Sequence, residues 1–370
     1  MKHYFKIIKS EIVLLPQLLN FLFSTKKKAL YVGCTGMGNL GDEAIFAALK
    51  DYLSKEVCIY SIPYNNVNAG KIARKFFIKK PDFIILGGGT IVKKGPKESY
   101  LKIMINQMSL YPDSKVVVLG PGVADADFAK ENGDVVDTLG WKKFLDQASF
   151  VSVRGVLSIN QLKKWNVEQE LSIFHDPALF YAKEAIKPKS RTKKIGINFA
   201  FIGHKIYGKQ PELIEKFANE LVNLLIADNW DIHLYPTTVT DLNYMQNKIG
   251  LIRHENIKIY QDYVSIEKSL KFLESMDVFL GQRLHSIIFA ACTYTPFHAI
   301  EYEPKTSDFL LTTGFEGYST KSDELDASKV FKTIKNLYSN IDIEQEKAFQ
   351  LVAFAKNEQE KCLEKMFFKK

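Results

Sequence analysis

Short apolar runs alternate with longer stretches of helical periodicity along most of the chain. In the first half the apolar runs cover residues 29–33, 57–62, 82–87, 115–120 and 149–153. In the second half they cover residues 194–200, 231–236, 257–260, 277–280 and 297–302. Such alternation is typical of βαβ units. It predicts an α/β fold of two Rossmann-like, doubly wound parallel-sheet domains that face each other across a cleft.

The chain is long enough for two domains of ordinary size, each with its own core. A basic stretch separates the two halves, since residues 183–194 hold five lysines, one arginine and one proline, as an exposed linker would. We therefore expect an N-terminal segment (1–28), two Rossmann-like domains (29–185 and 186–343) and a C-terminal helix (344–370).

The N-terminal segment combines an apolar stretch with flanking lysines. Residues 12–23 are mostly apolar and lie before the triplet Lys26–Lys28, which runs directly into the first predicted strand without a small-residue cleavage site. Two interpretations remain open, namely an amphipathic segment on an anionic membrane surface and a helix that caps the first domain. No apolar run reaches the roughly 18 residues that a membrane span requires.

Composition narrows the class of protein only in part. A hydrophobic share of 46% and a charged share of 25% exclude a disordered chain. Fifty basic against 42 acidic residues give a net charge of +8, which favours anionic partners of an unspecified kind. The four cysteines are widely spaced and form no CxxC pair, so we expect neither disulfides nor a metal site, and a cytoplasmic location.

A glycine-rich turn follows the first predicted strand. Gly36, Gly38 and Gly41 satisfy the dinucleotide pattern G-x-G-x-x-G, but the acidic residue expected about 20 positions later is missing. Asp42 and Glu43 also lie where a pyrophosphate would bind and would repel it. The turn therefore suits a polyhydroxy ligand, with the plain helix cap by Asp42 as the alternative.

Three further strand ends in the first half carry similar features. Gly87–Gly89 and Gly120–Gly122 leave backbone amides open to close approach by a ligand. Arg154 follows the fifth predicted strand and adds a cation at the rim of the predicted cleft. Its alternative role is an ordinary surface ion pair.

The second half contains a sharper signal. Arg283 and His285 stand between a predicted strand and a helix start, where amides, helix dipole and guanidinium together bind an anion. Histidine there can also transfer a proton near neutral pH. The alternative is a capping histidine beside a structural arginine. Glu301, Glu303 and Lys305 add two carboxylates and a cation at the next strand end.

Six motifs occur in an order that resembles the polysaccharide pyruvyl transferase family across residues 29–315. They are Gly-Asn-Leu-Gly-Asp-Glu-Ala-Ile (38–45), Leu-Gly-Gly-Gly (86–89), Ser-Val-Arg-Gly (152–155), Asp-Pro-Ala-Leu (176–179), Arg-Leu-His (283–285) and Glu-Tyr-Glu-Pro-Lys (301–305). The resemblance implies a fold like that of the GT-B glycosyltransferases. It also implies transfer of a pyruvyl group from phosphoenolpyruvate to a sugar, giving a pyruvate ketal on a surface polysaccharide.

The resemblance also implies roles for individual residues. The donor would be held in the C-terminal domain and by one arginine of the other domain, through Arg154, Arg283, Leu284 and His285. By the same resemblance His285 would be the acid or base. From the residues themselves, Asp42, Glu301 or Glu303 could orient or deprotonate the sugar hydroxyls, and we expect His285, Arg283 and Asp42 to be catalytic. We expect the sugar acceptor at Gly38, Asn39, Asp42, Gly88, Gly89, Glu301 and Glu303, mainly on the first domain.

Phosphoenolpyruvate would be a co-substrate, with no cofactor, metal or nucleic acid involved. A lipid-linked acceptor would give the basic N-terminal segment a reason to contact the inner membrane. Two other functions remain open. A GT-B glycosyltransferase would use a nucleotide sugar and release a nucleoside diphosphate, whereas a non-catalytic glycan-binding protein of a capsule assembly complex would release no phosphate.

Overall fold

The computed structural model describes residues 15–36, 38–63, 78, 80–94, 100–249 and 254–368. The chain divides into two compact units. Unit 1 comprises Met1–Met37, Ile45–Pro177 and Glu358–Lys370, and unit 2 comprises Gly38–Ala44 and Ala178–Asn357. Each unit is described by itself below.

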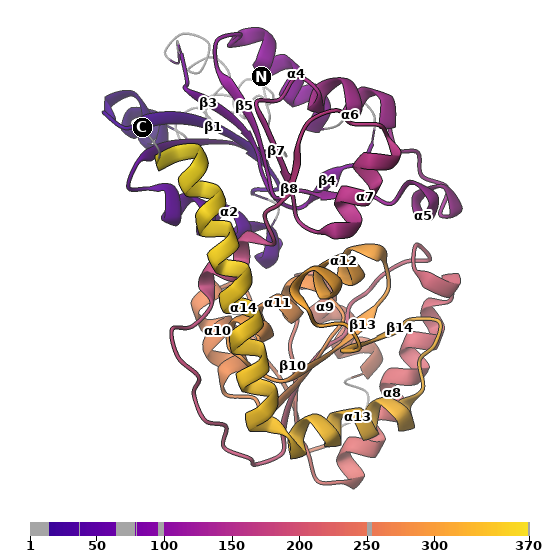
Figure 1. The fold of residues 1–370 in the computed structure, drawn as a ribbon. Helices are drawn as coiled ribbons and strands as arrows, with labels where there is room; N and C mark the ends of the chain where they lie inside the picture. Colours follow the sequence, from indigo (N-terminus) through magenta and orange to yellow (C-terminus); the bar gives the residue numbers. More distant parts are fainter. Residues whose placement is uncertain are drawn as a thin grey trace, which may run out of the picture. The chain divides into compact units, whose positions relative to one another are not determined.

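Unit 1 is built on a parallel sheet of six strands in the order β2-β1-β3-β5-β7-β8 (Figure 1). The strands are β1 (Lys27–Gly33), β2 (Val57–Pro63), β3 (Phe83–Leu86), β5 (Lys115–Leu119), β7 (Phe150–Val153) and β8 (Leu171–Ile173). A separate parallel pair consists of β4 (Thr90–Val92) and β6 (Gly122–Val123). The central strands β1, β3, β5 and β7 are nearly continuous apolar runs because helices cover both faces of such a sheet.

The helices of unit 1 contribute large side chains to its core. They are a helix at residues 15–23, α2 (Leu40–Leu53), whose first turn belongs to unit 2, α4 (Tyr100–Leu110), α5 (Ala126–Glu131), α6 (Thr138–Leu145) and α7 (Val156–Lys164). Met104 of α4 and Trp141 of α6 are fully buried against the strands. The end of the chain also packs here, since the Phe367 ring lies 4.9 Å from the Phe83 ring of β3.

Unit 2 is built on a second parallel sheet of six strands in the order β11-β10-β9-β12-β13-β14. The strands are β9 (Lys194–Asn198), β10 (Asp231–Leu234), β11 (Ile257–Ile259), β12 (Val278–Gly281), β13 (Phe297–Glu301) and β14 (Ser319–Lys321). Counted along the chain, this is the order 3-2-1-4-5-6 of a Rossmann sheet. The direction of winding reverses between β9 and β12, and ligands of such folds bind at that switch point.

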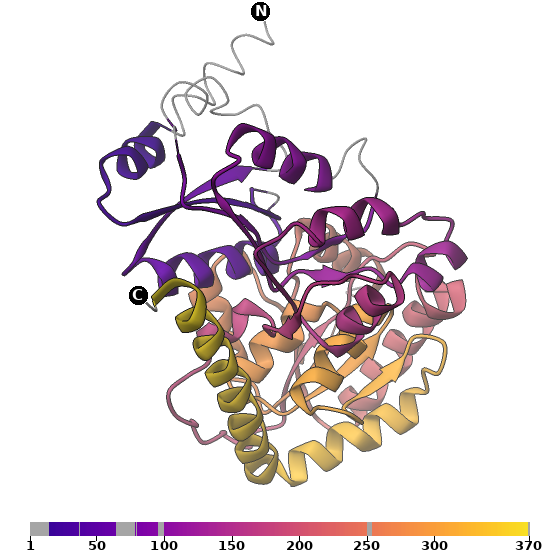
Figure 2. The same ribbon diagram turned by 45° about the horizontal axis from the view of Figure 1, so that its top comes forward.

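Helices cover both faces of the unit 2 sheet and give it two cores. The helices are α8 (Pro211–Ala227), α9 (Val239–Tyr244), α10 (Ile266–Glu274), α11 (Leu284–Cys292), α12 (Pro304–Thr313), α13 (Ala327–Ser339) and α14 (Ile341–Leu363). Ile287 of α11 and Leu273 of α10 belong to one core, and Leu221 of α8 and Ile334 of α13 to the other. Figure 2 shows the turn from α13 into the long helix α14. The predicted doubly wound α/β fold is confirmed.

All ten predicted strands are present, with ends that differ by a few residues. The structure adds β4, β6, β8 and β14, which the sequence analysis missed. Each of these has only two or three residues. Runs that short give too few positions for an apolar pattern to be recognised.

The unit boundary differs from the predicted division at residues 185 and 186. The chain passes from unit 1 to unit 2 between Pro177 and Ala178. Ala178 and Leu179 are fully buried in a core of unit 2, and the Cys292 thiol lies 3.3 Å from the Ala178 carbonyl oxygen. The predicted boundary was therefore too late, because these apolar side chains already belong to the second unit.

The basic stretch at residues 183–194 is fastened to unit 2. The buried Asp277 carboxylate accepts hydrogen bonds from the backbone N–H groups of Arg191, Thr192 and Lys194 at 2.8–3.0 Å. Most of this stretch is exposed, as predicted, but it lies within unit 2 and leads into β9, so the prediction of a linker between the two domains was wrong.

Two other segments also differ from their predicted limits. The C-terminal helix begins at Ile341, and its residues up to Asn357 belong to unit 2. Residues 38–44, predicted in the first domain, belong to unit 2 as well. Leu40 and Ala44 are buried in the core that also holds α11, which explains the assignment.

Much of the predicted N-terminal segment lies outside the described residues, which begin at residue 15. The helix at residues 15–23 buries Leu18 and Phe21 in the core of unit 1, as the capping interpretation predicts. Leu15, Leu19 and Phe23 on its other side are exposed. Among the described helices, none is both long and apolar enough to cross a bilayer.

Candidate functional site

One buried side-chain amide, that of Asn198, connects the strand ends at the switch point of the unit 2 sheet. Asn198, the last residue of β9, is fully buried and accepts a 2.8 Å hydrogen bond from the backbone N–H of Arg283 through its Oδ1. Its Nδ2 donates to the carbonyl oxygen of Tyr235, just after β10, at 2.8 Å. This side chain therefore ties together the ends of β9, β10 and β12 and fixes the backbone from which the Arg283 side chain extends.

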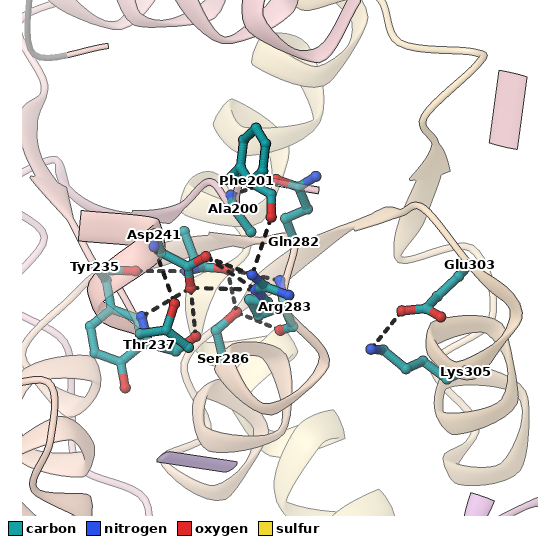
Figure 3. A network of polar contacts seen from close by, with 12 residues as sticks. Ala200, Phe201, Tyr235, Thr237, Asp241, Gln282, Arg283, Ser286, Glu303 and Lys305 are labelled. Carbon is teal, nitrogen blue, oxygen red and sulfur yellow. Dashed lines mark hydrogen bonds and ion pairs between the residues drawn. The ribbon is translucent and has the colours of Figure 1, made fainter. Parts of the chain in front are cut away.

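The Arg283 guanidinium is held by a buried carboxylate (Figure 3). Its Nη2 lies 2.7 Å from Asp241 Oδ1, and its Nε lies 3.3 Å from both Asp241 oxygens. Nη2 also donates to the Phe201 carbonyl oxygen at 3.4 Å. Asp241 is fully buried, and Thr237 Oγ1 donates to its Oδ2 at 2.9 Å. Nη1 takes part in none of these bonds, and about 26% of the Arg283 side chain remains exposed.

The charge of Arg283 is stabilised despite this burial. Burial works against the charged form, but the hydrogen bonds and charge of Asp241, with a further contribution from Tyr302, outweigh it and raise the pKa of Arg283. The guanidinium is therefore permanently charged and oriented, with one edge directed away from its carboxylate partner.

His285 lies in the first turn of α11, against the glycine turn at residues 38–44. A Cβ atom on Gly41 would overlap the His285 imidazole, so glycine is required for this close approach. Both segments belong to unit 2. The structure thus brings Gly38, Asn39 and Asp42 into the unit that holds His285, rather than into the predicted acceptor domain.

The start of α2 is capped by Asn39 and not by Asp42. Asn39 Oδ1 accepts a 3.0 Å hydrogen bond from the backbone N–H of Gly41. Asp42 and Glu43 lie in the first turn of the helix, half-buried, where the helix dipole favours their negative charge. Asp42 lies in the same unit as His285, and its predicted catalytic role stays a prediction.

The two glutamates after β13 have different environments. Glu301 is buried and accepts hydrogen bonds from the hydroxyls of Ser307 and Ser319, which gives it a structural role in unit 2. Glu303 pairs with Lys305 at 2.6 Å and is partly exposed. The predicted acceptor roles of Glu301 and Glu303 both stay predictions.

Arg154 lies in unit 1 and is buried there, with only 2% of its side chain exposed. Its Nη1 lies 3.7 Å from the fully buried Asp176 carboxylate, and its Nη2 donates to Thr90 Oγ1 at 3.2 Å. Gly122 makes room for the guanidinium, since a Cβ there would lie 2.7 Å from Nη2. The expectation of a cation at the rim was therefore wrong, because Arg154 connects three loops inside the unit. Its donor-binding role stays a prediction.

The glycines after β3 are explained by packing within unit 1. A Cβ on Gly87 would overlap Tyr31, and one on Gly88 would overlap Ile45. Gly89 has a φ of +92°, a conformation that other residues rarely adopt. Close packing thus accounts for Gly87 and Gly88 and the backbone conformation for Gly89, while the acceptor role of Gly88 and Gly89 stays a prediction.

The sequence analysis missed Asn198, Thr237 and Asp241. Each follows or ends a strand of unit 2, and Asp241 lies in α9 three residues after its cap, Thr238. A polar residue at a strand end is a usable signal, but the ion pair joins positions 42 residues apart, which no local pattern reveals. The candidate site is therefore the group of strand-end turns of unit 2 around Arg283 and His285.

Solved structures share the fold of the chain at low sequence identity. UDP-GlcNAc 2-epimerase from Neisseria meningitidis, bound to UDP-GlcNAc, has a TM-score of 0.59 at 11% identity, covering 91% of this chain and 100% of that chain. MnaA from S. aureus with UDP has a TM-score of 0.54 at 11% identity, covering 88% and 91%. An alpha-glucosyltransferase in complex with UDP has a TM-score of 0.53 at 13% identity, covering 92% and 100%. These likenesses show a GT-B-like fold.

The family was identified from the sequence. No curated protein matches the chain. The family model for polysaccharide pyruvyl transferase matches residues 39–304, which run from just before α2 to the first residue of α12 and include the turns after β12 and β13. The chain therefore belongs to the polysaccharide pyruvyl transferase family.

Proposed function

We propose that this transferase moves the pyruvyl group of phosphoenolpyruvate onto two hydroxyls of a sugar, forming a pyruvate ketal for a surface polysaccharide. Family membership supports the class of reaction. The observation that carries the donor assignment is the Arg283 guanidinium, oriented by buried Asp241 at the switch point of the unit 2 sheet. An oriented guanidinium is the usual protein partner of a carboxylate or phosphate.

The donor would lie at the start of α11. Arg283 offers its Nη1 edge, and the first N–H groups of α11, at Leu284 and His285, point out of the helix end. A negatively charged group placed there is stabilised by the guanidinium and by the helix dipole together. No cap side chain occupies this helix end among the described residues.

His285 is proposed as the proton donor. A proton delivered to the methylene carbon of phosphoenolpyruvate leaves oxocarbenium character on the adjacent carbon, which one sugar hydroxyl attacks. The C–O bond to phosphate then breaks, and the second hydroxyl closes the ketal. The two sugar hydroxyls each lose a proton. One of these protons replaces the proton that was delivered to carbon, and the other leaves on the released phosphate.

The acceptor hydroxyls need a group that orients or deprotonates them. Asp42 is our candidate, because it lies in the same unit and in the turn that packs on His285. A carboxylate beside an imidazole gives the site both an acid and a base. Glu303 is the second candidate, since Glu301 is occupied by two serine hydroxyls.

We further propose that the acceptor is lipid-linked and that the exposed side of the helix at residues 15–23 contacts an anionic membrane. Leu15, Leu19 and Phe23 are exposed there, and Phe23 keeps 81% of its area open to solvent. A cavity of about 550 Å³ adjoins them, lined in part by Leu19, Phe23, Lys26, Lys50, Val57 and Ile59. Apolar side chains beside lysines suit the acyl and headgroup regions of such a surface.

Product analysis tests the proposed reaction. Purified protein is incubated with phosphoenolpyruvate and a panel of nitrophenyl and lipid-linked sugars, while free phosphate and product mass are followed. We expect phosphate release that depends on one acceptor and matches formation of its ketal. Release of a nucleoside diphosphate from a nucleotide sugar, or sugar binding without turnover, would instead support the glycosyltransferase or the glycan-binding protein.

Variants connect this activity to the site. Arg283→Met removes the guanidinium and should weaken binding of phosphoenolpyruvate. His285→Ala should lower turnover by about 10²–10⁴-fold while phosphoenolpyruvate still binds. Arg191→Met is the matched control, because Arg191 is exposed and pairs with Asp342 on the surface. Full turnover of the His285 variant would remove the proposed proton donor.

A further inference from the structure

The loop after β9 holds an exposed aromatic side chain beside Arg283. Phe201 keeps 57% of its area open to solvent, yet its carbonyl oxygen accepts a hydrogen bond from Arg283 Nη2 at 3.4 Å. Figure 3 shows this carbonyl oxygen directed at the guanidinium and the ring projecting away from the ion pair of Arg283 with Asp241. A large apolar surface therefore lies next to the polar network of the candidate site.

The backbone of this loop is held at several points. The Ala200 N–H donates a 2.7 Å hydrogen bond to the side-chain oxygen of Gln282, which is fully buried. Phe199 before Phe201 and Ile206 after it are buried in the core of unit 2 that also holds α8 and α13. The fold thus sets the position of Phe201 in advance, which lowers the entropy lost when a ligand binds to it.

Helix α9 contacts the Phe201 ring. Tyr244, the last residue of α9, has its ring centre 6.1 Å from that of Phe201, and the two ring planes are inclined at 53°. Asp241, which holds the Arg283 guanidinium, lies three residues earlier on the same face of this helix. One short helix therefore supports both the cation and the aromatic ring.

The chemistry of this ring suits one reactant of the proposed transfer. A pyranose carries most of its hydroxyls around its rim and has a face of C–H groups, which packs on an aromatic ring. The anionic groups of phosphoenolpyruvate would instead lose hydration against an apolar ring. Sugar packed on Phe201 would keep its rim hydroxyls available to a donor at Arg283. Ligand sites commonly combine an aromatic surface with a few oriented polar groups in this way.

We propose that Phe201 binds the acceptor sugar by packing against the C–H face of a pyranose ring. This inference rests on the proposed function and adds a residue that selects the acceptor without transferring a proton. It also gives unit 2 a contact with the acceptor that is independent of the glutamates after β13.

Steady-state kinetics with the acceptor varied at saturating phosphoenolpyruvate tests the contact. We expect Phe201→Ala to raise the KM for the sugar by about 5–30-fold with little change in kcat, because one apolar contact made in both ground and transition state is lost. The calorimetric Kd of phosphoenolpyruvate should stay the same. Phe201→Tyr keeps the ring and should restore the KM.

Phe354→Ala is the matched control. Phe354 is exposed to a similar extent, at 64%, but lies on α14 rather than in a strand-end turn. This variant should leave the KM for the sugar within about twofold, as surface substitutions usually do. Equal acceptor KM values for the wild type and Phe201→Ala would show that the assignment of Phe201 is wrong while the proposed function stands.

Saturation-transfer NMR gives a second readout that needs no turnover. With the full chain and a panel of methyl pyranosides, we expect signal from the C–H protons on one face of a bound ring, and loss of that signal in Phe201→Ala. If the wild type forms no ketal but shows this signal, the proposed reaction is wrong and the sugar contact stands. Absence of the signal, or a Phe201-dependent affinity for uridine diphosphate in its place, would overturn the sugar contact.

Discussion

The position of the Arg283 guanidinium depends on Asp241. We expect Asp241→Asn, which keeps the shape but removes the charge, to lower kcat/KM for the donor by about 10–100-fold, mainly through a higher KM. The reason is that the neutral side-chain amide at position 241 would no longer stabilise the charge of the Arg283 guanidinium or hold it in position. Steady-state kinetics with phosphoenolpyruvate varied would measure this.

Asp231→Asn serves as the control for that variant. Asp231 is partly exposed in β10 and pairs with His233 and Lys258 away from the strand-end turns. An Asp241 variant with unchanged kinetics and an unchanged melting temperature would show that Arg283 does not need this partner.

Two buried histidines should make the protein sensitive to acid. Burial lowers the pKa of His298 to about 4, and burial, opposed in part by Glu358, lowers that of His175 to about 4. Unfolded histidines titrate near 6.5, so between pH 6.5 and 4 the unfolded chain binds more protons than the folded one. Stability is therefore full above pH 6.5 and falls as the pH is lowered to about 4.

Denaturant unfolding at pH 7 and pH 4.5 checks this expectation. We expect each histidine to contribute up to about 2–3 kcal/mol to the decrease in unfolding free energy. His298→Gln, which retains a polar end for Thr320, should reduce the difference between the two pH values. His204→Gln at an exposed position should not, and equal pH dependence of all three proteins would contradict the account.

At the scale of single residues, the sequence predicted which side chains could bind an anion or transfer a proton. It did not predict which residues hold those side chains in place. Arg283 and His285 follow from a strand end and a helix start that can be read locally. Asn198 and Asp241 hold Arg283 across large separations in sequence, so only the folded sheet brings them together. The burial of Arg154 depends likewise on Asp176 and on the space that Gly122 leaves.

Among the elements, the first turn of α2 has the most specific geometric requirement. Gly41→Ala would place a methyl group on the His285 ring and displace it. We expect turnover to fall by at least about 10-fold, because displacing a catalytic group by about 1 Å has such effects, while the melting temperature changes little. Kinetics and thermal unfolding of the same preparation would test this.

Gly203→Ala is the control for the glycine turn. A Cβ at Gly203 meets nothing within 4 Å, and its φ is compatible with other residues. Wild-type turnover by the Gly41 variant would mean that the His285 ring does not depend on this turn.

The helix at residues 15–23 carries the membrane proposal. We expect Leu19→Glu combined with Phe23→Glu to reduce binding to vesicles of phosphatidylglycerol and phosphatidylcholine by about 10-fold or more, because two apolar contacts are lost. Vesicle sedimentation measures the bound fraction. Phe354→Glu alters an exposed apolar residue of α14 and serves as the control. Equal binding by all proteins would rule out this surface as the contact.

Element prediction succeeded where an apolar run was long enough to be recognised and failed for β4, β6, β8 and β14. The limits of the units were harder to predict. The amino-acid composition of residues 38–44 and 178–182 does not show to which of the two units these segments belong. They belong to unit 2 because Leu40, Ala44 and Leu179 enter its core.

At the scale of the molecule, fold and family agree. The order of the unit 2 strands places Arg283 and His285 at the switch point of a Rossmann sheet, where ligands of this fold class bind. GT-B-like neighbours share that architecture at 11–13% identity, which does not define a substrate. The family match supports the class of reaction, a transferase of polysaccharide biosynthesis.

Transfer in deuterium oxide tests the central claim most directly, because it reports on protonation of the donor carbon. With phosphoenolpyruvate and a sugar acceptor, we predict a ketal whose methyl group carries one deuterium, formed together with an equal amount of phosphate. The Arg283→Met and His285→Ala variants should form little of it, and Arg191→Met should form as much as the wild type. Absence of the ketal, or a methyl group without deuterium, would contradict the account.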